Sequence, residues 1–288
     1  MYCEDIVASV LSCRDNAPKS NPIWQYHPRS DHHSKVLSAA LLIDLISECK
    51  TLQRQIKDNS VRFGINHTIT DKTSGNTKDL DLVIFSPDQS SKEENQSSLL
   101  EYISGIPNLK ESSCSIAAAT IEHWSKIKRA QSGGLLMTIE AKAIMTEFGK
   151  AFPRFYDELS SSQRIVCNSG LGCITAAAVM INHSDEFISP TIAHNATPEE
   201  GKPKKSRNHE KKLKECYQNK LLQLPMKNNE NPNAGYDEVL AIDIFMRNDG
   251  SKVKAIKNFN KPDRCDHLTY SRSIQQLSTI YTEKWRDL

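Results

Sequence analysis

The chain has 288 residues, enough for one large domain or two small ones, and 38% of them are hydrophobic. Together with a mean hydropathy of −0.53, this composition indicates a globular protein with a polar surface. The formal net charge is only +2, from 37 basic and 35 acidic residues. The total charge therefore does not mark a nucleic-acid-binding protein, although local basic patches still can.

The sequence contains neither a signal-peptide pattern nor an apolar run approaching about 18 residues, so we expect no membrane association. Its eight cysteines lie far apart, and none forms a C-x-x-C pair. This spacing is typical of reduced, mostly buried thiols in a cytoplasmic protein.

Periodicity and turn residues predict the elements of the first half. Ahead of the first helix, the cluster His27, Asp31, His32 and His33 invites a metal-site interpretation, but an exposed polar loop is favoured. The predicted elements are a helix over 35–57 capped by Ser34, a hairpin with strands over 61–70 and 79–85, a loop over 86–98, a helical turn over 99–103 and a helix over 115–130.

The second half continues the alternation of helices and strands. Its predicted elements are a strand over 135–142, a helix over 144–160 ended by Ser160-Ser161-Ser162, a buried strand over 175–182, a polar segment over 189–235, a strand over 237–247 and a helix over 267–284. The order predicts an α/β fold with a mixed central sheet flanked by helices. We expect one domain, 1–288, whose core covers about 35–188 and 236–288.

Acidic side chains lie at the ends of two predicted strands. The strand over 79–85 begins with Asp79 and Asp81, and the strand over 135–142 ends in Glu140-Ala141-Lys142. Residues two apart on a strand point to the same side, so Glu140 and Lys142 share one site. If the two strands are neighbours, the acids converge beside Lys142.

Such a cluster favours a Mg²⁺ site, with Mn²⁺ as a possible substitute. Carboxylate oxygens are ligands that Mg²⁺ prefers, and the ion usually keeps waters and binds substrate phosphate oxygens. It lowers the pKa of a bound water and stabilises charge in the transition state, while Lys142 orients that water or neutralises developing charge. This chemistry hydrolyses phosphodiester bonds. The alternative is that Glu140 and Lys142 form a surface salt bridge.

An Asp followed by Glu-x-Lys on the adjacent strand resembles the PD-(D/E)xK nucleases, which include most type II restriction endonucleases and many repair nucleases. The resemblance covers about residues 35–182. It implies a restriction-endonuclease-like core with insertions, in which Asp81, Glu140 and Lys142 are catalytic. It further implies that Asp81, Glu140 and the Ala141 carbonyl bind the metal. Asp79 stays an alternative first acid.

In this family an N-terminal helix often donates a further acid, and Glu48 is the candidate. The chain departs from the family pattern because no proline precedes the first acid and because residues 86–134 form an unusually long insert. We expect this insert to fold outside the sheet and to approach DNA or a partner subunit.

Basic residues after the motif are candidates for phosphate binding. For those in the polar segment, a solvated surface is about equally favoured. The candidates are Lys150, Arg154, Arg164, Lys204, Lys205 and Arg207.

The expected function is therefore that of a Mg²⁺-dependent endonuclease acting on double-stranded DNA. The resemblance favours a sequence-specific type II restriction enzyme, cytoplasmic in a bacterium or archaeon, that acts as a homodimer on a symmetric site. Two alternatives stay open: a repair or structure-specific nuclease of the same fold, and a non-catalytic DNA-binding protein.

Overall fold

A computed structural model describes the fold of most of the chain. The described residues are 1–13, 24–28, 30–70, 74–87, 96–130, 133–169, 172–190, 197–205, 209–231, 234–257 and 259–288, with the backbone alone at 149–150, 152–154, 169 and 209.

The centre of the molecule is a mixed sheet, which has seven strands within the described residues. In spatial order these are β3 (Lys128–Arg129), β1 (Arg62–Thr70), β2 (Thr77–Pro87), β4 (Gly133–Ile144), β5 (Ile174–Asn182), β8 (Glu238–Phe245) and β9 (Lys254–Ala255). β1, β2 and β4 form an antiparallel meander, and β4, β5 and β8 run parallel. The predicted α/β class with a mixed sheet is confirmed.

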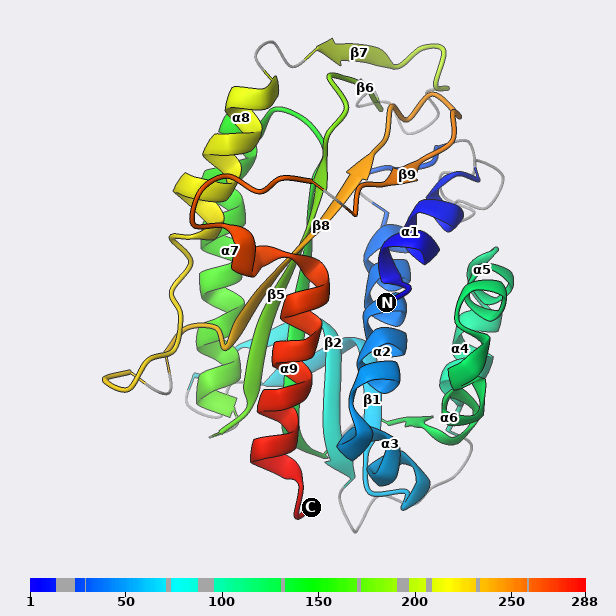
Figure 1. Cartoon of the computed structure of the whole chain (residues 1–288), viewed down its shortest axis with the longest axis vertical. Coiled ribbons are helices and arrows are strands. Elements are labelled where there is room, and N and C mark those ends of the chain that lie inside the picture. The colour runs from blue at the N-terminus through cyan, green and yellow to red at the C-terminus, as the bar shows by residue number, and fades with distance from the viewer. Residues whose placement is uncertain are drawn as a thin grey trace.

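Helices cover both faces of the sheet (Figure 1). On one face, α2 (His32–Glu48) packs on β2 and β4, and α9 (Tyr270–Trp285) packs on β8, with α1 (Cys3–Leu11) beside them. On the other face lie α7 (Phe148–Ser169) and α8 (His209–Cys216). β5 is buried at every position because it lies between these layers, which explains its continuous apolar sequence.

The helix predicted over 35–57 is in fact two helices. α2 ends at Glu48 and α3 (Lys50–Lys57) begins at once, because Cys49 is extended, with φ −94° and ψ 101°. The Cys49 thiol accepts the backbone N–H of Leu52 and so caps α3. The prediction of Ser34 as the N-cap was also wrong. α2 begins three residues earlier than expected, after Asp31, and Ser34 lies inside the helix.

The insert over 86–134 does not lie wholly outside the sheet. The single helix predicted over 115–130 is wrong, because this region ends in β3, which pairs with β1 at the sheet edge. Before it come short helices that pack beside α1, α2 and α3. These are α4 (Leu99–Ser104), α5 (Leu109–Ile116), the 3-10 turn η2 (Ala118–Thr120) and α6 (Ile121–Lys126).

The helix after β4 is longer than predicted. α7 continues past Ser160-Ser161-Ser162 to Ser169. The hydroxyl of Ser162 donates to the carbonyl of Glu158 one turn earlier, so this serine bonds within the helix instead of ending it.

The polar segment over 189–235 contains ordered elements. β6 (Glu186–Ser189) and β7 (Lys202–Lys205) form a hairpin, and α8 continues into the π-helical turn η3 (Tyr217–Leu221). Cys216 and Tyr217 are fully buried, which explains why this part of the chain is held on the sheet.

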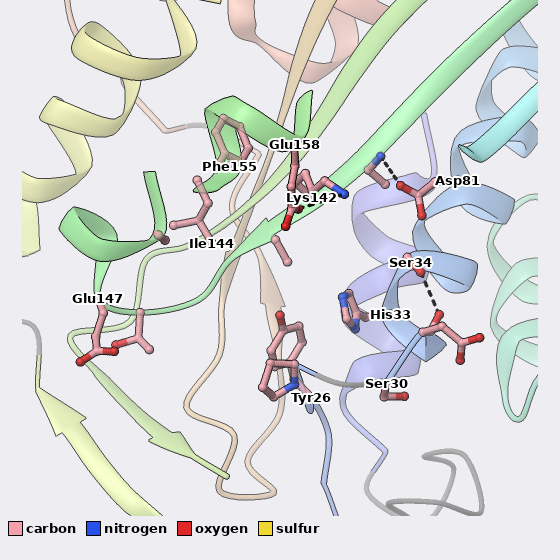
Figure 2. Close-up of a pocket in the computed structure, with 16 residues that line it drawn as sticks. Tyr26, Ser30, His33, Ser34, Asp81, Lys142, Ile144, Glu147, Phe155 and Glu158 are labelled. Carbon is pink, nitrogen blue, oxygen red and sulfur yellow. Dashed lines mark hydrogen bonds and ion pairs between the residues drawn. The ribbon is translucent and has the colours of Figure 1, made fainter. Parts of the chain in front are cut away.

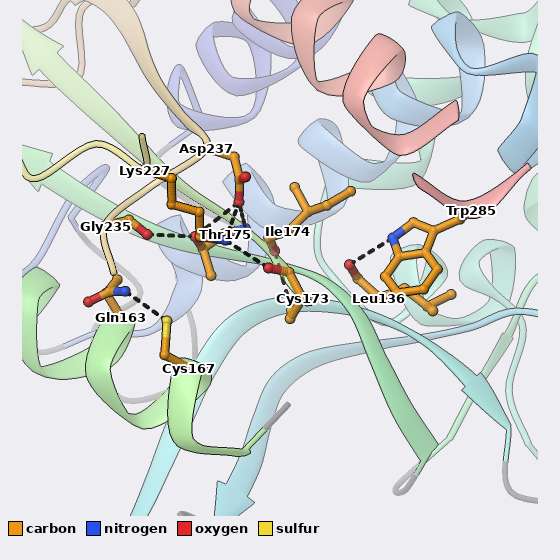
Figure 3. Close-up of polar contacts among 10 residues, drawn as sticks. All are labelled: Leu136, Gln163, Cys167, Cys173, Ile174, Thr175, Lys227, Gly235, Asp237 and Trp285. Carbon is orange, nitrogen blue, oxygen red and sulfur yellow. Dashed lines mark hydrogen bonds and ion pairs between the residues drawn. The ribbon is translucent and has the colours of Figure 1, made fainter. Parts of the chain in front are cut away.

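A polar network ties the end of this segment to the sheet (Figure 3). The ammonium of Lys227 donates to the carbonyl of Cys173 at 2.9 Å and to the carboxylate of Asp237 at 2.5 Å. The same carboxylate accepts the backbone N–H of Thr175 at 2.7 Å. The network therefore joins the loop after η3 to the first residues of β5 and β8.

Two general expectations can be compared with the fold. All eight cysteines are free, and five of them are buried, as expected for reduced core thiols. Among the described helices, none has the length and apolar composition needed to span a bilayer.

Candidate functional site

The site lies where β2 and β4 separate. The two strands pair from Pro87–Gly133 to Leu82–Ile139, and Asp81 is the next residue of β2. Beyond this point a side chain, and not a backbone carbonyl, connects the two strands: Asp81 Oδ2 accepts the backbone N–H of Ala141 at 2.8 Å. The acidic positions of the two strands are therefore neighbours, although both lie inside the strands and not at the predicted ends, since β2 begins at Thr77 and β4 continues to Ile144.

Glu140 and Lys142 extend from the same side of β4. The Lys142 ammonium lies 2.8 Å from Glu140 Oε1 and 3.5 Å from Glu158 Oε2 on α7. Only 4% of the Glu140 side chain and 22% of the Lys142 side chain are exposed. The pair is thus largely removed from solvent, unlike the surface salt bridge that sequence reasoning left open.

Burial strongly perturbs the acid–base behaviour of Asp81. Desolvation, followed by repulsion from Glu140, raises the pKa of Asp81 to about 7. For Lys142, burial acts to lower the pKa, but the adjacent carboxylates, Glu140 first, outweigh it and raise the pKa above its ordinary value. At neutral pH the site therefore combines a protonated lysine with an aspartate whose ionisation is opposed by burial and by the neighbouring Glu140.

A pocket of about 690 Å³ opens beside these residues (Figure 2). Residues 141–144 of β4 form part of its lining, together with Asp81. One wall comes from the first turn of α2 and the chain before it. The other comes from α7, through Phe155 and Glu158. Figure 2 shows Lys142 directed into the space between these walls.

His33 lines this pocket, although sequence reasoning assigned it to an exposed polar loop. It belongs to the first turn of α2, and its ring centroid lies 4.5 Å from that of Tyr26. Its Nδ1 is buried and has no hydrogen-bond partner. Burial, and then the positive charges of His32 and Lys142, lower the pKa of His33 to about 4. No sequence signal separates His33 from its neighbour His32.

Two observations fit a divalent cation at these acidic positions. Glu140 Oε2 is buried without a hydrogen-bond partner, and repulsion from Glu140 adds to burial in raising the pKa of Asp81. A hard cation bound by both carboxylates and the Ala141 carbonyl would give Glu140 Oε2 a partner. It would also offset the repulsion between Asp81 and Glu140. Within the described part of the chain, no three His, Cys, Asp or Glu side chains gather closely enough to hold a metal ion. The remaining ligands would therefore be waters and substrate oxygens.

The two additional acids lie elsewhere. Glu48 ends the 17-residue helix α2, about 25 Å from the turn that contains His33. There it lines a second pocket of about 460 Å³. Asp79 is exposed and accepts the hydroxyl of Thr68 at 2.5 Å. Of the described residues that line the first pocket, only Asp81 comes from β2, so the geometry favours Asp81 over Asp79.

The proposed phosphate-binding residues are only partly placed. Lys204 lies 2.9 Å from Glu147, which lines the pocket, so β7 reaches the pocket rim. Lys205 pairs with Glu186 at 2.7 Å, and Arg164 is exposed on α7 beyond Glu158. The Lys150 and Arg154 side chains and all of Arg207 lie outside the described part of the chain.

Comparison of the chain with protein-family models, with curated proteins and with solved structures finds no match in any of the three.

Proposed function

We propose that the protein is a metal-dependent nuclease that hydrolyses phosphodiester bonds of double-stranded DNA. The observation that carries this proposal is the meeting of Asp81, Glu140 and Lys142 where β2 and β4 separate, at the edge of an open pocket. Two carboxylates that repel each other and one buried carboxylate oxygen without a partner together favour a cation site.

The charge of the pocket supports the need for a cation. Its described lining includes the acids Asp31, Asp81, Glu147 and Glu158 but only one lysine, Lys142. A phosphate would be repelled by this excess of acid unless a divalent cation offset it. Without a cation, the pocket is therefore poorly suited to bind a phosphate. With a divalent cation bound, it is suited to bind one.

The roles of the residues follow from their positions. Asp81, Glu140 and the Ala141 carbonyl would hold Mg²⁺, which when bound lowers the pKa of a water and offsets charge on the phosphate. Lys142 stays protonated beside Glu140, and its ammonium neutralises negative charge as it develops on the phosphate oxygens. Glu158 contacts the same ammonium from α7 and limits its movement.

The finer proposal is a type II restriction enzyme acting as a homodimer in a bacterium or archaeon. It rests on the resemblance of Asp81 and Glu140-Ala141-Lys142 to the PD-(D/E)xK motif and on the antiparallel-then-parallel sheet that carries it. A structure-specific nuclease would have the same site. The non-catalytic alternative keeps the Glu140–Lys142 pair as a structural ion pair.

Incubation of the protein with plasmid DNA and Mg²⁺ separates these functions. Discrete fragments support a restriction enzyme, a smear supports a nuclease without sequence preference, and an intact plasmid that is nevertheless bound supports a DNA-binding protein. Asp81→Asn should abolish cleavage. Asp79→Asn is the matched control, because it changes the same residue type on the same strand outside the pocket.

Calorimetric titration with Mg²⁺ or Mn²⁺ tests the metal site without any turnover. Asp81→Asn and Glu140→Gln should each weaken metal binding at least about tenfold, because each removes one anionic ligand. Asp79→Asn should bind metal as the unchanged protein does. Equal metal affinity in all four proteins would contradict the assigned ligands.

A further inference from the structure

The ring of His33 is fixed on the wall of the pocket. Tyr26 packs against it at a centroid distance of 4.5 Å. Tyr26 is in turn held by Asn248, which accepts its backbone N–H at 3.0 Å and donates to its carbonyl at 3.0 Å. In Figure 2 the imidazole lies on the side of the pocket facing Lys142, between Asp81 and Tyr26.

The ring nitrogen Nδ1 of His33 lacks a partner within the protein. It is buried and makes no hydrogen bond, although polar atoms in such positions are nearly always satisfied and cost free energy when they are not. His33 lines the pocket and its side chain as a whole is only half-buried, so a small rotation of the ring would bring this nitrogen within reach of a molecule bound there.

The chemistry of the pocket indicates what that partner is. His33 is uncharged at neutral pH because burial, His32 and Lys142 hold its pKa at about 4, and an uncharged imidazole still carries one N–H. The ionised carboxylates of the lining can only accept hydrogen bonds. The N-terminus of the 17-residue helix α2 directs its positive end to the same place. An anionic group bound there would therefore meet donors from two different elements, Lys142 of β4 and His33 of α2.

We propose that His33 is a substrate-contacting residue, whose Nδ1–H donates a hydrogen bond to a non-bridging oxygen of the phosphodiester that Lys142 contacts from β4. This inference rests on the proposed nuclease function. No bond forms or breaks at His33; the ring orients the phosphate and stabilises charge on its oxygen as water attacks.

Three substitutions of His33 test the hydrogen bond. Asparagine places an amide N–H near the position of Nδ1, aspartate has the same shape but can only accept and is anionic, and alanine has no polar atom. In Mg²⁺, His33→Ala should lower kcat/KM for duplex DNA about 10- to 100-fold. His33→Asp should lower it further, and His33→Asn should recover most of the activity.

The neighbouring His32→Asn is the matched control, because His32 occupies the same helical turn but is not among the residues that line the pocket. Its activity should stay within about twofold of the unchanged protein. Full activity in His33→Ala, or equal activity in His33→Asp and His33→Asn, would overturn the proposal. Thermal unfolding of each variant shows whether reduced activity reflects reduced folding.

Histidine-selective NMR gives a readout that does not depend on cleavage. The signal of His33 is assigned by its disappearance in His33→Asn, and thymidylyl-thymidine is then added to the unchanged protein with Mg²⁺. The Nδ1 resonance of His33 should move, whereas that of His32 should not. A shift in a protein that cleaves no DNA would refute the nuclease proposal but retain a phosphodiester contact. Cleavage without any shift would refute the His33 contact alone.

Discussion

Asp81 shows how a proposed metal ligand can lower the stability of its own fold. Its pKa is raised to about 7 in the folded protein by burial and by Glu140, whereas an unfolded aspartate titrates near 3.9. Between about pH 4 and pH 7 the folded state therefore binds more protons than the unfolded state. By linkage, the contribution of this residue to stability falls as the pH rises through that window.

Asp81→Asn should consequently stabilise the metal-free protein at pH 8. We expect a gain of about 1–2 kcal/mol in the free energy of unfolding, because the amide cannot ionise and removes the repulsion with Glu140. At pH 4 the gain should nearly vanish. Urea unfolding at both pH values in EDTA measures the effect, with Asp79→Asn as the exposed control. A decrease in stability at pH 8 would show that the carboxylate of Asp81 is structural.

Substitution of Lys142 should lower the rate of cleavage more than the affinity for DNA. Lys142→Ala should abolish cleavage while DNA binding survives, since its charge acts on the transition state more than on the ground state. The change also leaves Glu140 buried without its 2.8 Å partner, so some decrease in stability is expected. Cleavage assays and filter binding on folded protein separate the two effects. Unchanged cleavage would assign the Glu140–Lys142 pair to a structural role.

At the scale of elements, sequence reasoning succeeded where periodicity decides the outcome. The hairpin of β1 and β2, the strand β4 that carries Glu140 and the fully buried β5 were all predicted. The proximity of Asp81 to Glu140-Ala141-Lys142 was expected only if the two strands were neighbours, and the pairing of β2 with β4 meets that condition.

The errors in the predicted elements arise from backbone features that hydrophobic periodicity does not reveal. The apolar stripe continues from α2 into α3, so the break depends only on the extended backbone of Cys49. His33 lines the pocket because α2 begins at His32, ahead of the predicted start. Glu48 was proposed as a further acid because it lies on an N-terminal helix. In the structure it ends the 17-residue helix α2, at the end far from the pocket that contains Asp81.

If the protein binds DNA as proposed, the β6–β7 hairpin should contribute to the contact, because it reaches the pocket rim. β7 presents Lys202, Lys204 and Lys205, and Lys204 reaches the pocket-lining Glu147. Changing all three to glutamine should weaken DNA binding and reduce the slope of log K against log salt by about 0.9 for each phosphate that these lysines neutralise. Thermal stability should change little, because β7 is largely exposed.

Binding measured at several salt concentrations tests this prediction. A control of equal charge is available on α8, in Lys211, Lys212 and Lys214. An unchanged salt slope in the β7 variant would mean that Lys204 serves only to pair with Glu147. Deleting residues 198–212 would be a poorer test, because it removes all of β7 and part of α8, which leads into the buried Tyr217.

At the scale of the whole molecule, the described chain provides one set of Asp81, Glu140 and Lys142, beside the pocket between α2 and α7. A single set can hydrolyse only one strand of a duplex at a time. Cutting both strands in one event requires a second copy, and a two-fold axis would direct two identical sites to opposite strands.

The number of active copies should therefore determine the product. If the homodimer acts, supercoiled plasmid should pass directly to the linear form when protein exceeds the dimer dissociation constant. When the protein is diluted below that constant, the nicked circle should accumulate, because occupancy of the second site falls by mass action. Sedimentation measured over the same concentrations gives the dimer constant independently. Mixing unchanged protein with excess Lys142→Ala should convert linear product to nicked circles, because most pairs then contain one inactive site. Linear product that persists under both conditions would show that one subunit cuts the two strands in sequence, and the homodimer would then have no part in cleavage.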